Sequence, residues 1–167
     1  DYAAIVLTDL MSMSERRTDR LVNPDTSEGL PAFLAKRAGM QSGFMIPHVA
    51  CVALLCEAKV LAHPASVDNL PTSGGKEDHV SMGMTAALKL RTIAENAENL
   101  LAIELLTAAR ALEFRRPLKA GVGVEDAFAK LRALVPGSDE DRAMYREIAR
   151  VAEAIRAGEF DTEMEKL

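Results

Sequence analysis

One long helical pattern, residues 81–114, constrains the fold of this chain more than any other feature. Apolar residues recur in it every three or four positions, as on one face of a helix: Leu90, Ile93, Ala97, Leu101, Leu105, Ala108 and Leu112. Leu88, Leu100, Ile103 and Leu106 add apolar surface outside this stripe. The helix would be about 50 Å long, whereas a globule of this chain length would be about 40 Å across. We therefore expect its second apolar face to contact missing sequence or other subunits.

The composition favours a helical core built from small and aliphatic side chains. Hydrophobic residues make up 49% of the 167 residues, aromatic residues only 4%, and Trp is absent. Such side chains suit helices that pack closely side by side. We predict an all-α fold, a long-helix bundle that is one domain or one piece of a larger one.

Two further helical patterns precede the long one. Residues 1–22 are apolar on almost every side in their first half, so we expect this helix to be buried. After a short irregular apolar connection at residues 29–34, a second helix is expected from Phe44 to Leu61, with Pro47 tolerated in its first turns. Together with the long helix they form the expected core segment, residues 1–117.

Beyond Pro117 the pattern becomes that of a surface layer, residues 118–167. A short helix is expected at residues 125–134 and a last one at residues 140–157, which Ser138 and Asp139 could cap. The inward face of the last helix should consist of Met144, Ile148, Val151 and Ile155.

Charge and cysteine content exclude several classes of protein. The net charge of −5 argues against a nucleic-acid partner, which would require a basic surface. No apolar run is long enough to span a bilayer. Cys51 and Cys56 have neither a disulfide framework nor metal-ligand spacing, so we expect them to be small core residues in a reducing, cytoplasmic compartment. The chain shows no signal or transit peptide and begins without Met, and we expect it to be a fragment.

A polar loop, residues 62–83, separates the second and third helical patterns. Pro64, Pro71 and the pair Gly74-Gly75 interrupt helix formation, and the loop carries two histidines, three acidic residues and a lysine. It could be a solvated connection. It could equally carry chemistry, because loops held by rigid elements often do.

The acidic pair Glu77-Asp78 is the most prominent chemical feature of this loop. By residue type, the pair would most simply cap the following helix. A carboxylate at such a junction can also accept a cationic or N–H group of a substrate, and its pKa can be tuned. The histidines His48, His63 and His79 are spread without a metal-ligand pattern, so no metal site is expected.

The chain resembles the aromatic amino acid lyase family. The matching runs follow the family's order over the first two-thirds of the chain: Ser14–Arg17, Leu30–Leu34, Ser42–Met45, Lys59, Leu61–Asp68, Pro71–Ser73, Glu77–Gly83 and Leu101–Glu104. The runs His-Pro-Ala-Ser-Val-Asp and Glu-Asp-His-Val-Ser-Met-Gly are the most specific. The last third resembles the family only in its helical character.

The resemblance implies a C-terminal part of an elongated, mainly helical lyase that assembles as a homotetramer with shared active sites. It implies elimination of ammonia from L-histidine to give urocanate, with a methylidene-imidazolone group made from an Ala-Ser-Gly triplet as the electrophile. That triplet does not occur in this chain, so it would lie N-terminal to Asp1, and the chain alone is expected to be inactive. Metal is not implied.

Within the chain the resemblance assigns one active-site residue, Glu77, beside the substrate side chain, where a carboxylate suits an imidazole. Departures from the family occur at Gly75-Lys76, where Asn-Gln is usual, at Ala58, where Asn is usual, and at Pro47. Lys76 could pair with Glu77 and contact the substrate. Tyrosine or another aromatic amino acid therefore remains an alternative substrate, for a lyase or an aminomutase. A catalytically dead oligomerisation module and an unrelated helical binding protein are the remaining alternatives.

Overall fold

The computed structural model describes residues 1–161, and every regular element in that range is a helix. The long helices are α1 (Tyr2–Val22), α2 (Met45–Leu61) and α3 (Gly83–Phe114), and the shorter α4 (Val122–Leu134) and α5 (Tyr145–Arg156) follow them. Single 3-10 turns, η1 (Ala32–Leu34) and η2 (Ser73–Gly75), lie in the connections before α2 and α3. The predicted all-α, long-helix fold is confirmed.

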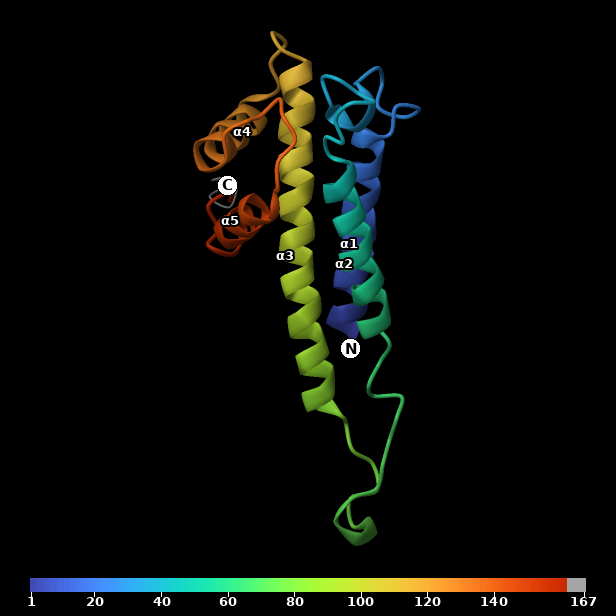
Figure 1. Ribbon diagram of the computed structural model, residues 1–167. Coiled ribbons are helices and arrows are strands. Elements are labelled where there is room, and N and C mark those ends of the chain that lie inside the picture. Colours follow the sequence, from blue (N-terminus) through green and yellow to red (C-terminus); the bar gives the residue numbers. More distant parts are fainter. Residues whose placement is uncertain (162–167) are drawn as a thin grey trace.

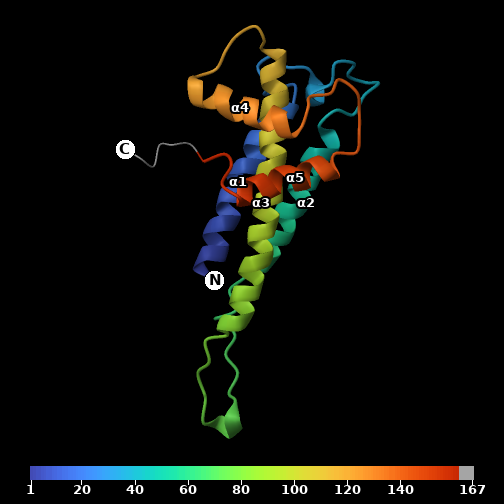
Figure 2. The ribbon, with the colours of Figure 1, turned by 90° about the vertical axis from the view of Figure 1, so that its left-hand side faces the viewer.

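The long helix α3 lies between two layers. On one side it packs against α1 and α2, which also contact each other, and on the other side it packs against α4 and α5 (Figures 1 and 2). The first turns of α3 extend past the neighbouring ends of α1 and α2 (Figure 1). Within residues 1–161, no helix combines the length and the apolar character that crossing a membrane requires.

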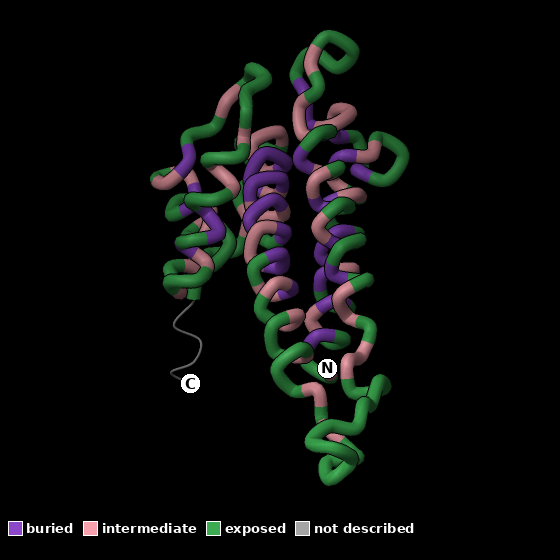
Figure 3. The backbone as a smooth tube through the Cα atoms, turned by 60° about the horizontal axis from the view of Figure 1, so that its bottom comes forward, coloured by how far each residue is buried: buried purple, intermediate pink, exposed green. Residues whose placement is uncertain are grey.

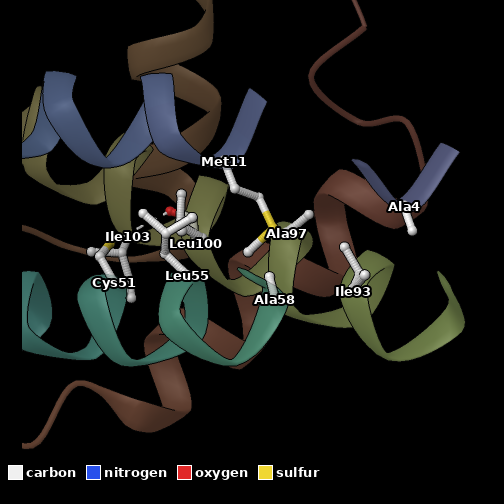
Figure 4. Close-up of a cluster of buried hydrophobic side chains, with 9 residues drawn as sticks. All are labelled: Ala4, Met11, Cys51, Leu55, Ala58, Ile93, Ala97, Leu100 and Ile103. Atoms are coloured by element: carbon white, nitrogen blue, oxygen red, sulfur yellow. Dashed lines mark hydrogen bonds between the residues drawn. The ribbon is translucent and has the colours of Figure 1, made fainter. Parts of the chain in front are cut away.

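The space between the three long helices is filled by small and aliphatic side chains (Figure 4). This core consists of Ala4, Met11, Cys51, Leu55, Ala58, Ile93, Ala97, Leu100 and Ile103. The alanines on all three helices allow the backbones to approach closely. A second core joins the other side of α3 to α4 and α5, and contains Ala102, Leu106, Ala109, Leu131, Val135, Val151 and Ala152.

The predicted apolar stripe of α3 is only partly right. Ile93 and Ala97 are buried, but the buried line continues through Leu100 and Ile103, whereas Leu101 is 39% exposed. The physical reason is that α3 packs on two opposite sides. Its apolar residues therefore cover more than one stripe, and spacing alone cannot assign them to one partner or the other.

The expectation that α1 is buried on almost every side is wrong for this chain. Ala4 and Met11 face the core, while Val6 is 60% and Leu10 is 52% exposed. Only α2, α3 and η1 make extensive contacts with α1 within residues 1–161. The outward apolar side of α1 is therefore uncovered in the structure, together with Val49 and Val52 of α2.

The last helix begins at Tyr145, later than predicted, and Ser138 and Asp139 do not cap it. The acidic residues before it instead contact the connection between η1 and α2. Asp139 pairs with Lys36 at 2.6 Å, Glu140 pairs with Arg37 at 2.8 Å, and the Asp141 carboxylate accepts hydrogen bonds from backbone N–H groups. These long-range contacts hold residues 139–141 outside the helix.

The predicted inward face of the last helix is confirmed, since Val151 is fully buried and Met144, Ile148 and Ile155 pack against the second core. The expected irregular connection also packs on the core, through Leu30 and Leu34. The division of the chain at residue 117 stays a prediction, and residues 162–167 of its second part lie outside the described residues.

Candidate active-site loop

The polar loop between α2 and α3, residues 62–82, projects beyond the ends of the helices (Figure 1). It is almost entirely exposed, in contrast to the buried line along α3 (Figure 3). A segment of this length with no regular structure beyond the single 3-10 turn η2 is uncommon in a compact domain unless it has a function or is disordered. Here it is held by specific hydrogen bonds at its base, its middle and its tip.

The base of the loop is tied to both neighbouring helices. The carboxylate of Asp1, directly before α1, accepts hydrogen bonds from the backbone N–H groups of Ala65 at 3.0 Å and Ser66 at 2.9 Å. From α3, the Lys89 ammonium donates to the backbone carbonyl of His63. Charged groups at the start of α1 and on α3 therefore fix the direction in which the loop leaves the bundle.

The middle of the loop is closed by one side chain, Asn69. Its Nδ2 donates to the carbonyl oxygen of Asp78 at 2.7 Å, and its Oδ1 accepts the backbone N–H of Val80 at 2.6 Å. The side-chain amide of Asn69 therefore takes the place of a pair of backbone hydrogen bonds between the outgoing and the returning segment of the loop.

The tip is a tight turn in which Thr72 and Glu77 face each other. The Thr72 N–H donates to the Glu77 carbonyl at 2.7 Å, and the Glu77 N–H donates back at 3.3 Å. Gly74 and Gly75 lie between them with φ of 67° and 83°, values that favour glycine because it has no Cβ. The Gly74-Gly75 pair is thus a requirement of this turn.

The Glu77 carboxylate is exposed and oriented by two hydroxyl groups. Thr72 Oγ1 donates to its Oε2 at 2.6 Å, and Ser73 Oγ donates to the same oxygen at 3.2 Å. These two hydrogen bonds, that from Thr72 first, lower the pKa of Glu77 because they stabilise its charged form. Glu77 is therefore an ionised acceptor whose Oε1 keeps its lone pairs available.

The structure contradicts the expectation that the acidic pair Glu77-Asp78 caps the following helix. Asp78 does not cap the following helix, because α3 begins only at Gly83, after Met82, and has no side-chain cap. The capping interpretation of the acidic pair is therefore wrong: both acids lie in the loop, not at a helix end. Within residues 1–161 no ion pair joins Lys76 to Glu77, and Lys76 lies exposed beside the turn.

The three histidines lie apart from one another. His48 contacts Glu15 between α1 and α2, His63 lies at the base of the loop, and His79 lies exposed on its returning side. Among residues 1–161, no group of three or more His, Cys, Asp or Glu side chains is arranged to hold a metal ion.

Sequence reasoning singled out Glu77, whose role in a site stays a prediction, but missed the residues that organise its loop. The only local signal for Thr72 and Ser73 was their position before the Gly74-Gly75 pair, which is typical of a turn. Asp1 gave no signal, since its contacts with residues 65 and 66 depend on how α1 and α2 pack.

Comparison with known proteins assigns this fold and loop to a family. The family model described as aromatic amino acid lyase matches residues 1–133. A histidine ammonia-lyase from Myxococcus xanthus is 54% identical over 160 residues, which cover 96% of this chain and 31% of that protein. The chain spans about a third of the length of the curated relatives it matches.

Solved structures show the same relationship. The crystal structure of histidine ammonia-lyase from Trypanosoma cruzi is 43% identical with a TM-score of 0.89, and the match covers 94% of this chain and 31% of that one. Tyrosine aminomutase from Streptomyces globisporus is 34% identical with a TM-score of 0.90, and the match covers 94% of this chain and 30% of that one. This chain therefore belongs to the aromatic amino acid lyase family.

Proposed function

We propose that this chain is the C-terminal part of a lyase that eliminates ammonia from L-histidine to give urocanate. The observation that carries the choice of histidine is the ionised, exposed carboxylate of Glu77 at the loop tip. An imidazole offers an N–H donor and carries positive charge when protonated, and an anionic acceptor suits both. The 54% identity with a histidine ammonia-lyase supports the same substrate.

In this proposal Glu77 binds and orients the substrate ring. Its Oε1 accepts a hydrogen bond from an imidazole nitrogen, which selects one ring tautomer and stabilises positive charge when the neighbouring carbon is deprotonated. Lys76, beside it, contacts the substrate from the exposed side of the turn. A phenyl ring would gain less from a charged acceptor, because it has no N–H or O–H group to donate.

The electrophile belongs to another part of the protein. When present, a methylidene-imidazolone group made from Ala-Ser-Gly would supply an electron-poor centre that activates the substrate amine for departure. This chain has no such triplet, and the groups that its loop offers, a carboxylate and hydroxyls, fit a substrate ring. The chain alone is therefore expected to give no urocanate.

The remaining parts of the site come from other polypeptide, N-terminal sequence and other subunits of a homotetramer. The exposed apolar side of α1 and α2 supports such an assembly, since uncovered patches of this kind mark contact surfaces. A reducing, cytoplasmic setting is part of the proposal, because Cys51 and Cys56 both carry free thiols. No nucleic acid or membrane partner is proposed.

A second candidate is a lyase or aminomutase that acts on tyrosine. The observation that favours it is the TM-score of 0.90 with tyrosine aminomutase, together with Lys76, a cation beside Glu77. The two candidates differ in substrate, so the full-length protein should be assayed with histidine and with tyrosine.

The deciding variant is Glu77→Gln in the full-length protein. It keeps the shape of the side chain and removes its charge, so histidine turnover should fall about ten- to a hundredfold. Asp78→Asn is the matched control, since it removes the adjacent exposed charge, and it should retain activity. Full activity of Glu77→Gln with histidine, or preferred turnover of tyrosine by the unmodified protein, would contradict the proposal.

A further inference from the structure

The loop tip contains two hydroxyl groups that the proposed chemistry does not itself require. Thr72 and Ser73 both donate to Oε2 of Glu77, at 2.6 Å and 3.2 Å. Within residues 1–161, the hydrogen bonds that reach this carboxylate all go to that one oxygen. The hydroxyls therefore fix the rotation of the carboxylate and, within residues 1–161, leave its other oxygen, Oε1, without a hydrogen-bond donor.

The backbone makes the same arrangement rigid. Thr72 and Glu77 exchange backbone hydrogen bonds at 2.7 Å and 3.3 Å. The backbone therefore holds the residue that carries the hydroxyl opposite the residue that carries the carboxylate. Next to the tip, the Asn69 side chain joins the two sides of the loop by hydrogen bonds to the backbone of Asp78 and Val80. An exposed glutamate without such a frame would sample several rotamers, and binding a ligand would cost the entropy of fixing one of them.

We infer that Thr72 is a positioning residue for the substrate-binding carboxylate of Glu77, with Ser73 in a supporting role. The inference rests on the proposed function of Glu77. Thr72 holds Oε2 so that Oε1 is presented to the substrate ring in a single orientation. The shorter contact assigns the larger effect to Thr72.

The hydroxyls also affect ionisation, because they stabilise the charged carboxylate and lower the pKa of Glu77. In the sequence, the charged neighbours of Glu77 at the tip are Lys76, which forms no ion pair with it within residues 1–161, and Asp78, which carries the same sign of charge. Loss of the Thr72 hydroxyl should therefore extend the protonated, inactive form of Glu77 to higher pH.

The test compares Thr72→Val, Thr72→Ser and Ser73→Ala in the full-length enzyme. Valine keeps the shape of threonine without the donor, so kcat/KM for histidine should fall about three- to tenfold, and the acidic limb of its pH profile should move to higher pH. Serine restores the donor, so kcat/KM for histidine and the acidic limb of the pH profile should return to those of the unmodified enzyme. Ser73→Ala should have a smaller effect in the same direction.

Thr92→Val in α3 is the matched control, since among the described residues 1–161 its hydroxyl donates only to the carbonyl of Leu88 in its own helix. The substrate's own ionisation affects all variants equally, so a difference between their acidic limbs reports on the enzyme. Thermal melts show whether each variant is folded.

Each outcome decides the inference. Equal profiles for Thr72→Val and the unmodified enzyme, with activity lost in Glu77→Gln, would overturn the role of Thr72 and leave the proposed function intact. Equal losses in Thr72→Val and Thr72→Ser with an unmoved acidic limb would assign Thr72 a merely structural role. Full activity in Glu77→Gln would overturn the function of Glu77 and the inference together.

Discussion

Nε2 of His48 lies 2.8 Å from Oε1 of Glu15, and this contact connects the first turns of α2 to α1. The Glu15 side chain is only 4% exposed, and Arg16 donates two hydrogen bonds to it at 2.6 Å each. Burial acts to raise the pKa of Glu15, but the hydrogen bonds from Arg16 and His48 outweigh it, so the pKa is lowered. The helices α1 and α2 are therefore joined by a buried, ionised carboxylate.

Glu15→Gln should destabilise the full-length protein by about 1–3 kcal/mol at neutral pH, because it leaves Arg16 and His48 without their anionic partner. A carboxylate with a lowered folded-state pKa contributes its full stability above the unfolded-state value and loses it as the pH falls through the folded-state value. The difference in free energy of unfolding between the unmodified protein and Glu15→Gln should therefore narrow below about pH 4.

Denaturant titrations at neutral and acidic pH check this expectation. Asp19→Asn is the control, since Asp19 lies 3.7 Å from His48 and is more exposed, and its effect should be smaller. If Glu15→Gln lowers the free energy of unfolding by the same amount at both pH values, the charge of Glu15 is not what stabilises the contact.

Gly43→Ala should destabilise the protein by about 1–3 kcal/mol. Gly43 has φ of 53°, and a Cβ atom there would lie 2.4 Å from the carbonyl oxygen of Phe33. That carbonyl cannot move freely, because it accepts the N–H of Phe44 at 2.8 Å. Gly123→Ala in α4 is the matched control, since a Cβ there meets no atom of the described part of the chain within 4 Å. Thermal melts should show a lower Tm for the first variant only, and equal melts would contradict the steric argument.

Cys51 should resist thiol reagents in the native protein. Burial first, and then the negative charge of Glu15, raises the pKa of its thiol to about 12, so the reactive thiolate is scarce near neutral pH. Maleimide labelling followed by peptide mass mapping should find Cys51 unmodified until the protein is unfolded in denaturant. Labelling at the same rate in native and unfolded protein would show that the core around Cys51 opens readily.

Replacing Val6 and Leu10 by Glu should dissociate the full-length assembly. Both side chains lie on the exposed apolar side of α1, and burying a new carboxylate in a contact between subunits is costly. Light scattering should report a smaller particle that keeps its helical content. Ala149→Glu, an exposed position on α5, is the control. An unchanged mass for the double variant would show that this side of α1 is not a subunit contact.

The sequence by itself determined the helices and the position of the polar loop between α2 and α3. Apolar spacing locates α1, α2 and α3 because helix formation depends on near neighbours, and Pro64 and Gly74 mark the break because their backbone preferences are local. The acidic pair Glu77-Asp78 stands out for the same reason, since it lies in a polar loop between apolar helices, whereas the choice of Glu77 from this pair rests on the family resemblance.

Only the tertiary structure decided which contacts the side chains make. The choice of Leu100 over Leu101 for the core depends on where α1 and α2 lie against α3, and the late start of α5 depends on Lys36 and Arg37, about a hundred residues away. The hydroxyl contacts of Glu77 join residues only four and five positions apart, and they depend on how the turn closes rather than on helical periodicity. Helical periodicity is a local property, whereas burial and hydrogen-bond partners follow from packing between distant segments.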